Sequence, residues 1–176
     1  MKYLGSFPRD NNFVADPSHG CLANVSKTLT ANATTANVPI FKVTGAVQIL
    51  GIWGIVTTVL GANNTAAYWR LNDQTNQSAI TLATGTTLSA APVGSMIVKK
   101  GLAGAALTLL SASQSRVSEP TTLETDFFSP FVVTELPGAE TDIEFVYTTT
   151  DAPTSGVIEF FVRWLPLSDT AQITTL

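Results

Sequence analysis

Residues Val38 to Thr65 read VPIFKVTGAVQILGIWGIVTTVLGANNT, and they carry the clearest structural signal in the chain. Val, Ile and Thr dominate the run, and their branched Cβ atoms favour an extended backbone. Gly45, Gly51 and Gly54 recur at short intervals that suit bulges and bends better than a helix. The run therefore predicts β-structure buried on both faces, as two strands over Ile40–Leu50 and Ile52–Leu60 with a kink at Gly51.

The composition limits the kinds of partner that this chain can have. It has 176 residues, of which 45% are hydrophobic and only 12% are charged, about half the usual charged share. The net charge is −4, and Lys99-Lys100 is the only basic dipeptide. A general nucleic-acid binder needs a basic stripe, so we expect no nucleic-acid partner. Low charge with abundant Thr is typical of a β-rich protein that packs against something else.

We expect no membrane partner either. Val43–Ala62 is uncharged and long enough to span a bilayer, but its hydroxyl and β-branched residues favour strands. No apolar core of signal-peptide length precedes Pro8, and the single cysteine, Cys21, allows no internal disulfide. The expected place of synthesis is the cytoplasm.

Residues 1–37 differ from the rest of the chain because they show no steady period of 2 or 3.6 residues. They predict an extended N-terminal arm that becomes ordered by lying on another surface. The alternative is a floppy terminus with incidental aromatics. If the arm docks, its apolar anchors are Tyr3, Leu4, Phe7, Phe13 and Val14.

Residues 38–176 predict an all-β body, a β-sandwich or jelly roll, with a short tail over Leu167–Leu176. The alternation in Asp142–Thr149 and Val157–Leu165 predicts an antiparallel hairpin with one buried face. Further expected strands and turns are Ala66–Leu71, Ser95–Lys99, an edge strand over Phe127–Leu136 that carries Pro130, and a tight turn at Gly85.

The sequence predicts no catalytic, cofactor or metal site. Its single histidine, His19, lies in the arm beside Cys21, and neighbours in sequence need not aim at one substrate. Zinc needs more His or Cys ligands, and no calcium-loop motif is present. Among the tryptophans, Trp53 and Trp164 are expected in the core, whereas Trp69, beside Arg70 and a polar loop, is expected to be exposed.

Three segments carry a family resemblance: Phe41–Thr58 (FKVTGAVQILGIWGIVTT), Gly61–Leu71 (GANNTAAYWRL) and Arg163–Asp169 (RWLPLSD). In these the chain resembles small structural proteins of tailed bacteriophages, of the kind encoded among the head genes as capsid decoration or cement proteins. The resemblance implies a non-enzymatic protein on the capsid exterior that binds the major capsid protein and bridges its neighbouring subunits. It also implies self-association, with a homotrimer expected first and a homodimer second.

Other functions remain open at this level. One is a receptor- or carbohydrate-binding module of a tail or fibre, for which Trp69 and Tyr68 would supply exposed aromatics. Another is a hydrolase with two converging carboxylates. A head–tail connector or tail-tube subunit is the nearest alternative to decoration.

Overall fold

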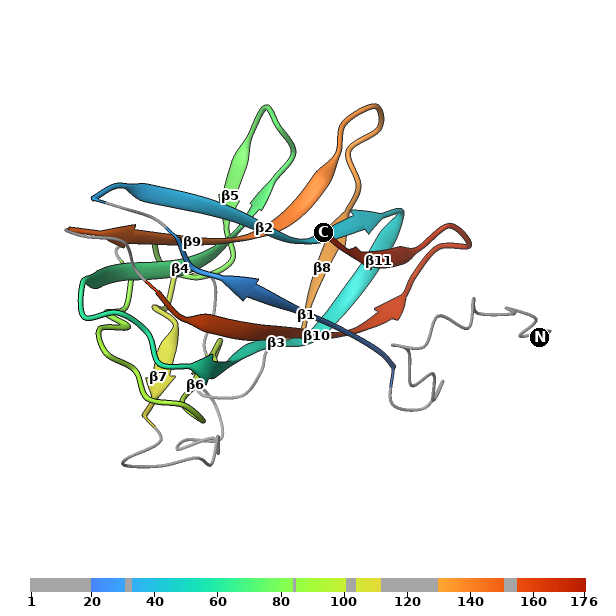
Figure 1. The fold of residues 1–176 in the computed structure, drawn as a ribbon. Helices are drawn as coiled ribbons and strands as arrows, with labels where there is room; N and C mark the ends of the chain where they lie inside the picture. Colours follow the sequence, from blue (N-terminus) through green and yellow to red (C-terminus); the bar gives the residue numbers. More distant parts are fainter. Residues whose placement is uncertain (1–19, 31–32, 84, 101–103, 112–129, 151–154) are drawn as a thin grey trace.

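The computed structural model describes residues 20–30, 33–83, 85–100, 104–111, 130–150 and 155–176. These form an all-β sandwich of two antiparallel sheets (Figure 1). The strands are β1 (Cys21–Thr28), β2 (Thr35–Thr44), β3 (Ala46–Thr58), β4 (Asn64–Asn72), β5 (Gln77–Ala79), β6 (Met96–Val98), β7 (Thr108–Leu110), β8 (Phe131–Thr134), β9 (Thr141–Thr149), β10 (Val157–Pro166) and β11 (Gln172–Thr175).

The two sheets share the long apolar run of the sequence between them. The six-stranded sheet has the order β1-β10-β3-β6-β7, with β8 also paired to β3, and the five-stranded sheet has the order β11-β2-β9-β4-β5. Within the run, β2 belongs to the five-stranded sheet, and the chain crosses at Gly45 to the other layer. There β3 forms a central strand of the six-stranded sheet, after which β4 returns to the five-stranded sheet. This double crossing explains why the run is so apolar: each of its strands turns one face toward the same core.

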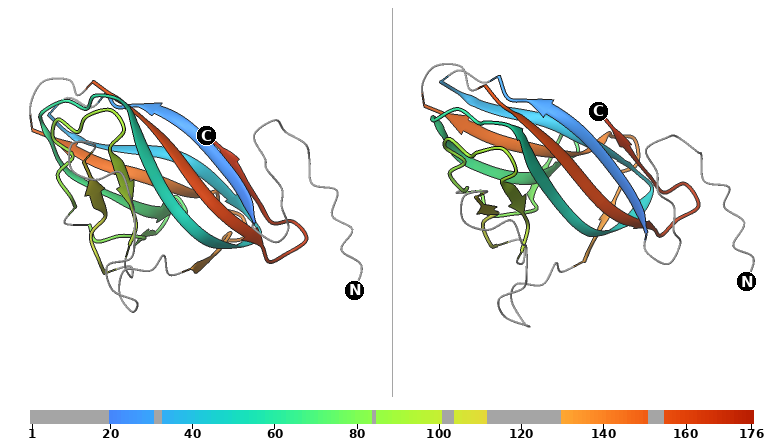
Figure 2. Two further views of the ribbon diagram at one scale, coloured as in Figure 1. Left: turned by 90° about the horizontal axis from the view of Figure 1, so that it is seen from below. Right: turned by 60° about the horizontal axis from the view of Figure 1, so that its bottom comes forward.

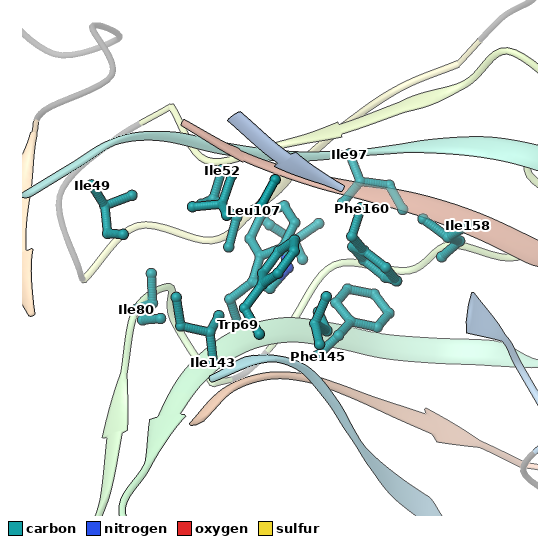
Figure 3. Packing of buried hydrophobic residues seen from close by; sticks show 14 of the residues in the cluster. Ile49, Ile52, Trp69, Ile80, Ile97, Leu107, Ile143, Phe145, Ile158 and Phe160 are labelled. Carbon is teal, nitrogen blue, oxygen red and sulfur yellow. The ribbon is translucent and has the colours of Figure 1, made fainter. Parts of the chain in front are cut away.

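The core lies between the sheets and is rich in large side chains (Figure 3). Phe145 of β9 and Phe160 of β10 bring the two layers together, with ring centroids 4.9 Å apart. Trp69 of β4 lies 6.0 Å from Phe145, at a tilted angle favoured by the ring quadrupoles. Ile49, Ile52, Ile97, Leu107, Ile143 and Ile158 fill the space around these rings.

The boundary between arm and body was predicted in the wrong place. Residues Cys21–Thr28 form β1 and pair along their whole length with β10, and β2 begins at Thr35. The alternation in CLANVSKT is short and rich in small polar residues, so only its pairing with β10 makes it a strand. Residues 20–37 are thus largely part of the sandwich. The five arm anchors, Tyr3, Leu4, Phe7, Phe13 and Val14, lie outside the described residues.

The predicted hairpin of the two C-terminal segments is wrong, although both segments are strands. β9 pairs with β2 and β4, whereas β10 pairs with β1 and β3, so the chain changes sheets between them. Their alternating patterns pack face to face across the core instead of edge to edge. The predicted tail is also partly a strand, since β11 pairs with β2.

The break in the apolar run falls at Gly45 and not at Gly51. Gly45 has φ +67° and lies between β2 and β3. β3 continues through Gly51, where a register shift against Arg163 and Trp164 makes a bulge. The predicted turn at Gly85 is confirmed, since Gly85 has φ +67° and its N–H donates to the Leu82 carbonyl. The predicted strand over Phe127–Leu136 is shorter in the described residues: β8 covers only Phe131–Thr134, and Pro130 precedes the strand instead of lying within it.

Replacing Gly45 by alanine is expected to lower the free energy of unfolding by about 1–3 kcal/mol through left-handed backbone strain alone. A Cβ atom there would also lie 2.6 Å from the Ser168 Oγ atom. That hydroxyl accepts a hydrogen bond from the Ala46 N–H at 3.0 Å, so moving it loses a bond as well. Urea unfolding monitored by tryptophan fluorescence measures the loss.

Gly138 provides the matched control, because its φ is +83° but no atom lies within 4 Å of an added Cβ. Gly138→Ala should therefore lower the free energy of unfolding only through the left-handed backbone strain, without a steric clash. Equal losses in the two variants would contradict the crowding at Gly45.

Candidate docking surface

The outer face of the six-stranded sheet carries side chains that the core does not use. Along β10 the residues alternate between buried and partly exposed, with Glu159, Phe161 and Arg163 on the outer face. Trp53 of β3 stands opposite Phe161, and their rings stack with centroids 5.4 Å apart and planes within 6°. Figure 2 shows β1, β10 and β3 side by side across this face. We call Trp53, Ile55, Phe161 and their neighbour Met96 the aromatic patch.

The same face becomes more apolar toward the end of the sandwich where β2 and β3 meet. Gln48 of β3 lies opposite Leu165 of β10 on one side and opposite Val132 of β8 on the other. Two residues earlier on β3, the Ala46 carbonyl accepts a hydrogen bond from the Leu167 N–H at 2.9 Å. Val132 and Leu167 are 57% and 53% exposed. We call Leu50, Val132, Leu165 and Leu167 the apolar end.

Gly20, the first described residue, lies beside the apolar end. A Cβ atom added at Gly20 would lie 3.2 Å from the Leu50 side chain and 3.3 Å from the Leu165 side chain.

The outer face of the five-stranded sheet is different, because its large side chains are tied to one another by charge. Glu144 of β9 accepts hydrogen bonds from Arg70 Nε at 2.6 Å and from Asn72 Nδ2 at 2.9 Å. Arg70 also donates from Nη1 to the Gln77 Oε1 atom at 2.8 Å. Glu144 and Arg70 are only 4% and 8% exposed, so the pair is buried although it lies on an outer face.

A second polar group extends this network along the same face. Lys42 forms an ion pair with Glu140, which also accepts a hydrogen bond from Gln74. Burial, assisted by the negative charge of Glu140, raises the pKa of Asp142 above its ordinary value. The charged groups Arg70, Glu144, Lys42 and Glu140 of this face thus bond to polar neighbours on the same face, whereas the Asp142 Oδ1 atom is buried without a hydrogen-bond partner among the described residues.

The prediction that Trp69 is exposed is wrong. Trp69 is fully buried in the core, and its place beside Arg70 already indicated this, because neighbours on a strand point to opposite faces. The prediction for Trp53 is wrong in the opposite sense, since Trp53 lies partly exposed on the outer face. Trp164 is in the core, as predicted.

The described residues bring together little that could perform catalysis. Cys21 is buried, and burial raises the pKa of its thiol, which disfavours the reactive thiolate. His19 lies outside the described part of the chain. Within that part, no group of three or more His, Cys, Asp or Glu residues could hold a metal ion.

Comparisons with known proteins identify no relative: no family model, no curated protein and no solved structure matches this chain. No helix among the described residues is long and apolar enough to cross a membrane, and the candidate stretch 43–62 lies mainly in β2 and β3.

Proposed function

We propose that this chain is a virion structural protein that binds the outside of a bacteriophage capsid and bridges neighbouring major capsid subunits. The observation that carries the proposal is the contrast between the two outer faces of the sandwich. One carries aromatic and branched side chains beside the charges of Glu159 and Arg163, and the other carries a polar network that joins Arg70, Glu144 and Gln77. The family resemblance of the sequence supplies the kind of partner.

The apolar end is the part of this surface that suits a protein lattice best. Its exposed Val132 and Leu167 would be removed from water on docking, which contributes about 25 cal/mol per Å² of apolar area before the cost of association. The arm anchors Tyr3, Leu4, Phe7, Phe13 and Val14 would add a second attachment on the same or a neighbouring subunit. Two linked contacts hold a protein on a lattice far longer than either contact alone.

Sedimentation with capsid shells tests this proposal. Purified full-length protein is mixed with shells of the major capsid protein from the same genome, and the bound fraction is measured against concentration. We expect saturable binding that Leu167→Glu weakens by about tenfold or more, because the variant places an unpaired charge in an apolar contact. Val59→Glu is the matched control: Val59 is 52% exposed but lies roughly 40 Å away, at the other end of β3.

Absence of saturable binding by the unaltered chain would contradict the proposal. Equal weakening by Leu167→Glu and Val59→Glu would exclude the apolar end as the contact.

A carbohydrate- or receptor-binding module is the second candidate, and the aromatic patch is the observation in its favour. Sugar sites use flat ring faces, however, and Trp53 and Phe161 cover part of each other's faces by stacking. Binding on a glycan array that is lost in Trp53→Ala would favour this second function. Trp69→Ala would not be informative for that test, since Trp69 is a core residue.

A further inference from the structure

Three carboxylates lie close together on the outer face of the five-stranded sheet, at the start of β9. Glu140 directly precedes the strand, and Asp142 and Glu144 follow it at the two-residue spacing that places side chains on one face. Asp142 is the middle one of the three. In the register of the sheet it lies between Lys42 of β2 and Asn72 of β4.

Glu144, on one side of Asp142, holds the guanidinium group of this face. It accepts a hydrogen bond from Arg70 Nε at 2.6 Å and another from Asn72 Nδ2 at 2.9 Å. The Asn72 oxygen is also engaged, since it accepts the Gln74 backbone N–H at 3.1 Å. Although Asn72 lies opposite Asp142, its hydrogen bonds therefore go to other groups.

Glu140, on the other side of Asp142, holds the ammonium group. Lys42 forms its ion pair with Glu140, and Gln74 Nε2 donates to the same carboxylate at 3.1 Å. The second bond joins the β4–β5 and β8–β9 connections, which project from the same side of the sandwich (Figure 1). Both cationic groups beside Asp142 are thus bonded to its neighbours, and the Asp142 Oδ1 atom is buried with no hydrogen-bond donor among the described residues.

We propose that Asp142 is a proton-uptake site, whose carboxyl group takes a proton from weakly acidic solution and thereby tightens the junction of β2, β9 and β4. A buried carboxylate oxygen without a donor loses its hydration and gains no bond in return, and a neutral carboxyl group bears much less of that cost. Glu140 and Glu144 add like-charge repulsion when Asp142 is ionised. Lys42 attracts the ionised form, but its ammonium group is held by Glu140.

The direction of the pH effect follows from the folded and unfolded states of Asp142. Burial, and after it the charge of Glu140, raises the pKa of Asp142 in the fold. The folded carboxyl group therefore binds its proton more tightly than the unfolded one does. The resulting stabilisation is fully present below the ordinary aspartate pKa of about 3.9, and it is lost as the pH rises through the raised pKa of the folded state.

Two other carboxylates near this junction act in the opposite sense. The hydrogen bond and charge of Lys42 lower the pKa of Glu140, and the backbone N–H of Asn76 lowers the pKa of Asp73. Their stabilisation is present above their ordinary pKa values and is lost as the pH falls through the lowered ones. This end of the sheet should therefore be most stable in weakly acidic solution. The inference goes beyond the proposed function, which does not depend on pH.

A carbon-13 NMR titration of the side-chain carboxyl groups in the full-length protein measures proton uptake directly. We expect Asp142 to titrate above the ordinary aspartate value of about 3.9, and Glu140 to titrate below the ordinary glutamate value of about 4.3. Lys42→Met should move the Asp142 midpoint further upward, because it removes a positive charge that lowers this pKa.

Asp142→Asn tests whether proton uptake tightens the junction, since it removes the titration with little change of shape. At about pH 7 the variant should melt about 2–4 °C above the unaltered chain, and at about pH 4 this advantage should disappear. Asp169→Asn is the matched control: it makes the same change at an exposed carboxylate in the β10–β11 connection, and the pH dependence of melting should stay as it was.

Amide hydrogen exchange, corrected for its intrinsic pH dependence, locates the effect. Protection at Lys42, Asn72 and Asp142 should rise more than protection along β10 when the pH is lowered from about 7 to about 5.

Two results would overturn the inference. One is an Asp142 carboxyl group that titrates at or below the ordinary aspartate value, as it would if it paired with Lys42 in solution. The other is an Asp142→Asn variant whose melting depends on pH in the same way as that of the unaltered chain. Sedimentation with capsid shells probes the other sheet, so either result would leave the proposed function standing.

Discussion

Trp69→Ala is expected to lower the free energy of unfolding by about 3–5 kcal/mol, the usual cost of emptying a large buried aromatic site. Trp69 is fully buried between the sheets and packs against Phe145, which in turn packs against Phe160 of the opposite layer. The cavity would therefore open at the point where the two sheets meet. Urea unfolding followed by far-ultraviolet circular dichroism measures the change without relying on the lost indole.

Two variants make this result specific. Trp69→Phe should retain much of the stability, because no described residue accepts a hydrogen bond from the indole N–H and none is lost. Trp53→Ala removes a ring from the outer face, and it should lower the free energy of unfolding by roughly 1 kcal/mol, the usual contribution of a stacked aromatic pair. A larger loss for Trp53→Ala than for Trp69→Ala would contradict the placement of both residues.

Arg70→Met is expected to destabilise the fold by about 3–5 kcal/mol, since it leaves the buried Glu144 carboxylate without its positive partner. Asn72 would still donate one hydrogen bond to Glu144, but a single neutral donor does not replace a guanidinium. The same change also removes the hydrogen bond that the Gln77 side chain accepts from Arg70, which weakens the pairing of β4 with β5. Thermal unfolding at neutral pH measures the effect.

The double variant Arg70→Met/Glu144→Gln should recover most of that stability, because it removes the uncompensated charge. Lys42→Met is the surface control: it breaks the exposed pair with Glu140 and should change the melting temperature little. If the double variant were as unstable as Arg70→Met, packing and not charge would explain the loss.

Local patterns in the sequence predicted the class of the fold and several of its details. The alternation in Val157–Leu165 identified the buried face of β10, with Ile158, Phe160, Val162 and Trp164 inward. Pro130 marked an edge, because proline cannot donate to a ladder, and β8 indeed pairs on one side only within the described chain. These features depend on the backbone chemistry of a few neighbouring residues, which a sequence displays directly.

The candidate surface could not be predicted in the same way. Trp53 was expected inside because its surroundings in the sequence are apolar, yet it lies on the outer face of the six-stranded sheet and stacks on Phe161. The bulge near Gly51 also shifts the alternation of β3, so counting along the strand misassigns its faces. For Trp69 the sequence did indicate burial, because Trp69 and the charged Arg70 are neighbours on a strand and point to opposite faces. The polar loop that follows led instead to the prediction that Trp69 is exposed.

The sequence by itself determined that this chain forms β-strands, where many of them run, and which face of the last long strand is buried. These follow from branched side chains, a period of two residues, and the turn chemistry of Gly, Pro and Asn. Only the tertiary structure decided that β9 and β10 belong to opposite sheets, that the chain crosses at Gly45, and that the charges of Glu159 and Arg163 flank a shared aromatic row. Pairing partners and cross-strand neighbours come from residues far apart in the chain, and alternation within one strand carries no information about which strand lies beside it.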